Sequence, residues 1–222
     1  MKLDELKNIV RNSGIVGAGG AGFPTYMKLD ERAETIIMNC AECEPLLRLH
    51  RQLLRDKAQE ILKIFAMLAD TVHAKEAVIG IKESYQETIE AVEAFIGEYP
   101  GMRIQKLPET YPMGDEVVLI YEATGKVIRP GGLPIEEGVA VFNVETVYNI
   151  YRAVEEQMPV MSKYVTIVGE VAQPVTVRMP LYTGDAIQNQ VRETVALQEK
   201  ARNDLEAARR GVTQATRQLF LG

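Results

Sequence analysis

Three short apolar runs, separated by helical patterns, limit the folds open to this chain more than any other feature. The runs occupy residues 35–39, 77–81 and 102–107. Each is short enough to be a buried strand. Apolar residues at helical spacing predict one long helix over residues 46–68, and a second helix follows with Ser84 as its cap and Glu87 completing a capping box. This β-α-β-α-β order predicts an α/β fold, a Rossmann-like parallel sheet with covering helices.

The alternation continues beyond the third strand and then stops. A helix begins at about Glu116, a short strand covers residues 138–142, and Asn143 caps the helix that comes next. After Pro159 the sequence becomes β-rich, and from about residue 186 it is one long helical pattern without proline. We therefore expect three parts, namely a site-bearing domain over residues 1–159, a partial β domain over 160–187 and a long helical tail over 188–222.

A glycine-rich loop precedes the first strand. Its glycines are Gly17, Gly19, Gly20 and Gly22. Bare backbone N–H groups in such a loop suit a phosphate, and Phe23 and Lys28 add an aromatic ring and a positive charge. The spacing matches the dinucleotide fingerprint, but that fingerprint follows a strand, whereas residues 3–12 here have a helical pattern. The loop predicts a nucleotide cradle unlike the standard NAD fold, and a simple glycine turn is the alternative.

Polar residues come directly after the first strand, where α/β proteins bind ligands. The segment is NCAECEP, residues 39–45. Glu42 and Glu44 are candidates for a general acid and base. Cys40 and Cys43 form a Cys-x-x-Cys pair, for which a redox or metal role is one interpretation and packing by small residues is the other. The nearby His50 is expected to be a surface or satisfied helix residue.

Composition excludes several classes of protein. The 222 residues carry a net charge of −6 and no basic patch, which argues against a nucleic-acid partner. No apolar run approaches the length of a membrane span, and the first residues do not form a signal peptide, so we expect no direct membrane insertion and a cytoplasmic protein. Two cysteines and two isolated histidines favour a reducing compartment and give no set of metal ligands.

Four segments in the same order resemble the NADH-binding flavoprotein subunit family of respiratory complex I. They are GAGGAGFPTYMK at residues 17–28, NCAECEP at 39–45, YPMGDE at 111–116 and NVET at 143–146. The chain looks most like the branch that holds the RnfC-type component of the Rnf electron transport complex and the cobalamin reductase of microcompartments. The β-rich piece after residue 160 resembles the start of that family's ubiquitin-like ligand-binding domain.

The resemblance implies an FMN site and a nearby NADH site. Residues that match FMN-binding positions of the family are Gly17, Gly19, Gly20, Lys28, Asn39, Glu42, Tyr111, Gly114, Asp115, Glu116 and Asn143. Phe23 and Glu44 match positions that meet the nicotinamide nucleotide. The implied activity is hydride transfer from NADH to FMN, followed by electron transfer to a 4Fe-4S cluster. Such a cluster usually needs four cysteines, so it would lie in a missing region or in an iron–sulfur or other electron-transfer subunit.

The chain also departs from the family. An acid expected in the second segment is Ala41, an expected glycine is Cys43, and the first of two expected asparagines is Phe142. The lysine and the aromatic residue that help to hold the dinucleotide have no counterpart in residues 129–134. The missing dinucleotide lysine and the missing cluster cysteines favour an alternative, a non-catalytic nucleotide-binding or scaffold module of an electron-transfer complex. With either function we expect the protein in the cytoplasm, at the periphery of a membrane complex or in a bacterial microcompartment.

The tail raises a separate question. From about residue 188 it resembles the helices of TolC-type outer-membrane efflux proteins, which nothing in the flavoprotein family does. A chimeric or truncated chain is one interpretation. An ordinary coiled or partner-docking helix, and with it a helical adaptor, is the other.

Overall fold

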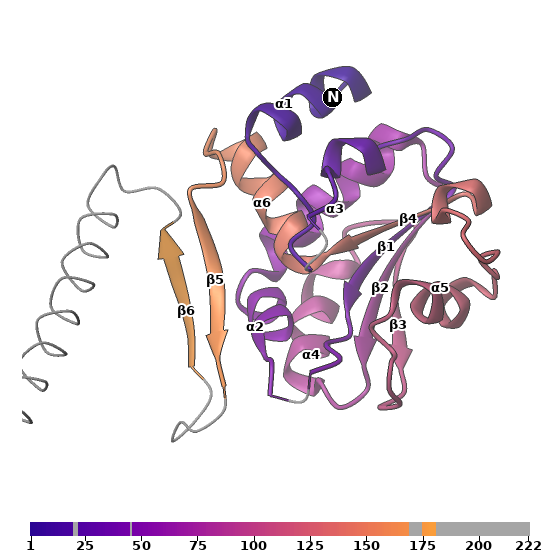
Figure 1. The fold of residues 1–222 in the computed structure, drawn as a ribbon, viewed down its shortest axis with the longest axis vertical. Helices are drawn as coiled ribbons and strands as arrows, with labels where there is room; N and C mark the ends of the chain where they lie inside the picture. Colours follow the sequence, from indigo (N-terminus) through magenta and orange to yellow (C-terminus); the bar gives the residue numbers. More distant parts are fainter. Residues whose placement is uncertain (20–21, 45, 169–174, 181–222) are drawn as a thin grey trace, which may run out of the picture. The chain divides into compact units, whose positions relative to one another are not determined.

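The computed structural model describes residues 1–19, 22–44, 46–168 and 175–180 (Figure 1). Four strands form its central sheet: β1 (Thr35–Cys40), β2 (Glu76–Lys82), β3 (Met102–Leu107) and β4 (Val139–Asn143). Their order is β3-β2-β1-β4, and every pair is parallel. The α/β fold with a parallel sheet is thus confirmed. The expected long helix after residue 186 and the position of Gly20 lie outside the described residues.

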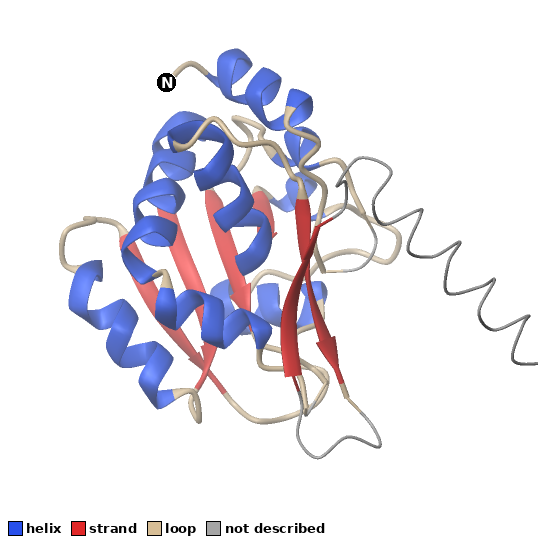
Figure 2. Ribbon diagram, turned by 90° about the vertical axis from the view of Figure 1, so that its left-hand side faces the viewer, coloured by secondary structure: helices blue, strands red, loops and turns tan. Residues whose placement is uncertain are grey.

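Helices cover both faces of the sheet (Figure 2). In chain order they are α1 (Leu3–Asn12), α2 (Leu49–Asp56), α3 (Ala58–Val72), α4 (Gln86–Ile96), α5 (Glu116–Thr124) and α6 (Val144–Glu155), with two 3-10 turns, η1 (Thr25–Lys28) and η2 (Pro134–Glu137). Alternate residues of β1 point to opposite faces. Ile36 and Met38 join the large core with α1 to α4 and α6, whereas Ile37 joins a smaller core with Leu119 and Ile120 of α5.

The strand order creates a switch point between β1 and β4. The chain moves outward from β1 to β2 and β3 and then returns to the other side of β1. Connections on the two sides of β1 therefore leave in opposite directions, which opens a crevice at the carboxyl ends of β1 and β4. The last residues in this register are Asn39 and Asn143, which are direct partners.

Two local predictions are wrong. The helix expected over residues 46–68 is broken at Lys57, whose φ of −130° and ψ of 32° are not helical, so α2 and α3 are separate helices. Ser84 does not cap α4, because the residue before that helix is Tyr85 and no side chain caps it. The Ser84 hydroxyl donates to Glu109 instead, and Glu87 forms an ion pair with Arg55 on α2.

The chain after α6 forms a separate two-stranded sheet of β5 (Ser162–Ile167) and β6 (Val175–Pro180). These strands match the β-rich segments expected after Pro159. The prediction that they begin a ubiquitin-like domain stays a prediction. In the part of the chain that the structure describes, no helix is both long and apolar enough to cross a membrane.

Candidate flavin site

A pocket of about 440 Å³ lies at the switch point, at the carboxyl ends of β1 and β4. Its walls come from the glycine loop, the last residues of β1 and β4, and the first turns of α5 and α6. The lining residues are Gly17, Gly19, Gly22, Phe23, Thr25, Lys28, Asn39, Gly114, Asp115, Glu116, Val141, Phe142, Asn143 and Thr146. Four segments that are far apart in the sequence therefore meet at one edge of the sheet.

The glycine loop is closed at its base and anchored on α6. The Gly17 N–H donates to the Phe23 carbonyl at 2.8 Å, and the Thr25 N–H donates to the Ile15 carbonyl at 3.3 Å. The Ala18 N–H donates to Thr146 Oγ1 at 2.9 Å. The residues after the glycines thus form the returning arm of a closed loop. This arrangement supports a ligand cradle rather than a simple turn.

Gly114 allows two backbone segments to meet at the edge of the pocket. A Cβ atom at this position would lie 1.9 Å from the Ala41 carbonyl oxygen and 2.8 Å from Cys43 Sγ. Asn39 ties the same two segments together: its Nδ2 donates to the Gly114 carbonyl at 2.9 Å, and its Oδ1 accepts the Ala41 N–H at 3.0 Å. Only glycine fits this approach without a backbone shift.

Two helices begin at the pocket and direct their positive ends toward it. Asp115 caps α5, and its Oδ1 accepts the N–H groups of Val117 and Val118. Asn143 caps α6, as predicted, and its Oδ1 accepts the Glu145 N–H at 2.9 Å. Helix N-termini attract anions, so this end of the sheet suits a ligand that carries phosphate.

His50, on α2, forms a hydrogen bond with the side-chain amide of Asn143. Because Asn143 Oδ1 caps α6, its Nδ2 faces His50 Nε2 at 2.9 Å and must be the donor. His50 Nε2 is then the acceptor, so the ring is neutral. Burial, with the nearby charge of Lys163, lowers the pKa of His50 to about 4. His50 is satisfied, as expected, but it supports the site, a role that sequence reasoning missed.

Glu42 lies behind the pocket lining. Its side chain is 1% exposed, and its Oε1 accepts the His50 N–H at 3.0 Å at the start of α2. Among the described residues its Oε2 has no hydrogen-bond partner, although Arg51 Nε lies 3.9 Å away. Burial raises the pKa of this carboxyl group. The structure therefore places Glu42 against the start of α2 and outside the pocket lining.

Lys28 is paired inside the protein. Its Nζ donates to Glu116 Oε1 at 3.0 Å and to the Val141 carbonyl at 2.9 Å, and it lies 5.7 Å from the centre of the Phe23 ring. These contacts put the lysine on the α5 side of the pocket, next to β4.

The remaining predicted residues differ in position. Phe23, Asp115 and Glu116 line the pocket with the glycines. Tyr111 is 82% exposed, and Glu44 is also exposed; neither contributes to the lining. Sequence reasoning did not single out three lining residues, namely Thr25, Val141 and Thr146, and it named Phe142 only as a departure from the family. Thr25 and Thr146 could have been predicted, because both lie inside the segments that carry the family resemblance.

The two cysteines have different environments. Both are free thiols; Cys40 is buried at the end of β1, where burial raises the pKa of its thiol, and Cys43 lies against Gly114. A raised thiol pKa disfavours redox chemistry, so these environments support the packing interpretation. Within the described ranges no three His, Cys, Asp or Glu side chains are grouped to hold a metal ion.

Comparisons with known proteins agree with this geometry. Residues 10–152 match the family model of the Nuo51 FMN-binding domain. The chain is 42% identical over 181 residues to the cobalamin reductase PduS of Salmonella typhimurium, covering 82% of this chain and 40% of that protein. It is 33% identical over 184 residues to one component of the Na⁺-translocating ferredoxin:NAD⁺ oxidoreductase complex of Acetobacterium woodii, covering 81% of this chain and 42% of that protein.

A solved structure has the same fold. An NAD⁺-reducing [NiFe]-hydrogenase chain superimposes with a TM-score of 0.64 at 25% identity, covering 81% of this chain and 37% of that one. The chain thus spans about two-fifths of the length of the curated relatives that it matches. The match over the whole central sheet and the glycine loop shows that the chain belongs to the Nuo51 FMN-binding domain family.

Proposed function

We propose that the switch-point pocket binds FMN and that the chain accepts hydride from NADH as part of an electron-transfer flavoprotein. The observation that supports this most strongly is the meeting of the glycine loop, Asn39, Asn143 and the starts of α5 and α6 in one pocket. Its volume lies within the range of roughly 300–1,000 Å³ that is usual for small-molecule sites.

The residues present fit a flavin mononucleotide. Gly17 and Gly19 add no side chain to the loop side of the pocket, next to the positive end of α6. We assign the phosphate to this end. Asn39 and the backbone around Gly114 supply polar groups for the ribityl chain and the ring, whereas Phe23 and the Lys28–Glu116 pair form the opposite rim.

The chemistry divides between cofactor and protein. When bound, FMN supplies hydride acceptance and one-electron release. The chain binds the cofactor, orients it through the fixed amides of Asn39 and Asn143, and offers Phe23 as a surface for a nicotinamide nucleotide. The whole chain has two cysteines, fewer than the four that a 4Fe-4S cluster usually requires. Electrons would therefore pass to a cluster in a further region or in a partner protein, as in a multisubunit complex.

A second candidate function is a nucleotide-binding or scaffold module without turnover. Glu44, one of the two residues assigned to NADH, lies outside the pocket lining, which favours this alternative. The two functions share the flavin pocket and differ only in the use of NADH.

A visible absorption spectrum distinguishes them. The protein is incubated with FMN, desalted and measured, and NADH is then added without oxygen. A retained flavin band that bleaches supports the proposed oxidoreductase. A retained band that stays unchanged supports the binding module. Loss of the flavin from folded protein would contradict both.

A further inference from the structure

Strand β5 contributes a lysine that reaches the glycine loop. Lys163 Nζ donates to the Ala18 carbonyl at 3.1 Å and forms an ion pair with Glu145 in the first turn of α6. The Ala18 N–H donates to Thr146 Oγ1 on the same helix turn. Ala18 is therefore held from both sides, through its N–H by α6 and through its carbonyl by β5.

Glu145 is a buried carboxylate whose described partners come from β5. Its side chain is 1% exposed. Lys163 pairs with Oε2, and the Tyr164 N–H donates to Oε1 at 3.3 Å. A buried carboxylate without a partner would be strongly destabilising. It would also place an uncompensated negative charge beside Thr146, at the end of the pocket to which we assign the phosphate.

Lys28, the lysine within the glycine-loop segment, does not serve this end of the pocket. It pairs with Glu116 and the Val141 carbonyl on the α5 side. Within the described part of the chain, the cation that contacts both the loop and the start of α6 is Lys163, which comes from a strand after the family match ends at residue 152.

We propose that Lys163 is a positioning residue that fixes the glycine loop and neutralises Glu145, and that it thereby sets the preference of the pocket for phosphate-bearing FMN over phosphate-free riboflavin. The inference deepens the proposed function and rests on it. It makes the first strand after α6 part of the flavin site.

The test is a fluorescence-quenching titration of the full chain with FMN and, separately, with riboflavin. Lys163→Met should weaken FMN binding by about tenfold and riboflavin binding by less than about threefold. Lys163→Arg should keep the preference for FMN over riboflavin that Lys163→Met loses, because arginine retains the positive charge and the hydrogen-bond donors. Lys126→Met is the matched control: Lys126 is similarly half-buried, donates to the Glu137 carbonyl and lies 3.8 Å from a Glu34 carboxylate oxygen, far along the chain from the loop.

Glu145→Gln keeps the inference testable if Lys163→Met does not fold. This change leaves the Lys163 charge unpaired, so the ratio of FMN to riboflavin affinity should rise. The double variant Lys163→Met/Glu145→Gln removes both charges and should return the ratio toward that of the wild type.

Two results would overturn the inference: equal weakening of both flavins by Lys163→Met, which indicates a merely structural lysine, or an unchanged ratio in Glu145→Gln. Failure of the proposed function is distinguishable from either, because the wild type would then bind neither flavin.

Discussion

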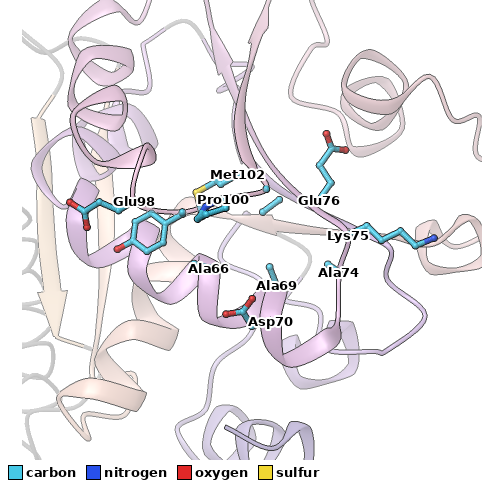
Figure 3. A pocket seen from close by; sticks show the side chains of 12 residues that line it. Ala66, Ala69, Asp70, Ala74, Lys75, Glu76, Glu98, Pro100 and Met102 are labelled. Carbon is cyan, nitrogen blue, oxygen red and sulfur yellow. The ribbon is translucent and has the colours of Figure 1, made fainter.

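The two ends of the central sheet both carry hollows, but helices begin at one hollow and end at the other. At the carboxyl ends of β1 and β4, two helices begin and the glycine loop lines the pocket. At the amino ends of β2 and β3, a hollow of about 230 Å³ lies where α3 and α4 end (Figure 3). Its charged lining residues are Asp70, Glu76, Glu98 and Lys75, and several alanines lie among them.

We infer that helix direction, rather than cavity size, distinguishes the two ends of the sheet as binding sites. Helix C-termini carry partial negative charge, and the carboxylates at the amino end add to it. An anionic cofactor is therefore disfavoured there. At the carboxyl end, phosphate binding is favoured by three features: the positive ends of the helices, the bare N–H groups of the loop and the side-chain amides.

Gly114→Ala should be the most damaging single change, because its Cβ would lie 1.9 Å from the Ala41 carbonyl oxygen. We expect a loss of about 3 kcal/mol or more in the free energy of unfolding, and loss of flavin retention. Urea denaturation followed by circular dichroism measures the first. The control is Gly97→Ala beside the amino-end hollow, where a Cβ meets nothing within 4 Å. Equal stability of the two variants would contradict the close approach at the pocket.

His50 should make stability depend on pH. The unfolded chain protonates this histidine below a pKa of about 6.5, whereas the folded protein keeps it neutral down to about 4. The unfolded state thus binds more protons between these values, so the contribution is fully present above pH 6.5 and is lost as the pH falls toward 4. It is on the order of 3 kcal/mol.

His50→Gln isolates this effect, because glutamine keeps an acceptor for Asn143 and does not titrate. The raised pKa of Glu42 acts in the opposite direction and is present in both proteins. Unfolding free energies measured from pH 4 to pH 7.5 should fall less steeply toward acid in the variant. Parallel curves would show that His50 is not held neutral.

Asp115→Ala should cost about 1 kcal/mol of stability, since it removes the cap of α5 at the pocket. Asp115→Ser, which retains a capping oxygen, should recover most of it. Thermal or urea unfolding measures both variants. If alanine and serine behave alike, the cap does not stabilise this end of the sheet.

Lys75→Ala should have no measurable effect on either stability or flavin binding. Lys75 pairs with Glu34 at 2.8 Å at the amino end, but both side chains are more than half exposed. The same titration and unfolding experiments apply. Weakened flavin binding in this variant would contradict the placement of the flavin site at the carboxyl end of the sheet.

The sequence predicted most of the fold because its signals were local. The strand at Met102–Leu107 and the helix at Leu3–Asn12 have the bounds that their periodicity indicated. The break at Lys57 was missed because apolar spacing continues through it and neither glycine nor proline marks it. A pattern of side chains does not report the backbone angles of a single residue.

The candidate site was only partly predictable, for a similar reason. Glycines, amides and acids at element ends are visible in sequence, and most of those residues line the pocket. The contacts of His50 with Asn143 and of Lys163 with Glu145 depend on tertiary packing, which no spacing encodes. The same holds for Glu42, whose polar character indicated a ligand contact but whose side chain packs against α2, outside the pocket lining.

The most direct test of the flavin pocket is an FMN titration of the wild type and of Gly19→Leu. A Cβ at position 19 would lie 3.5 Å from Asn143 Nδ2, an ordinary contact, so the fold should tolerate the change while the side chain fills the pocket. We expect the wild type to bind FMN, and Gly19→Leu to bind at least about tenfold more weakly with an unchanged circular dichroism spectrum. Equal FMN affinity of the two proteins would contradict the placement of the flavin at the switch point.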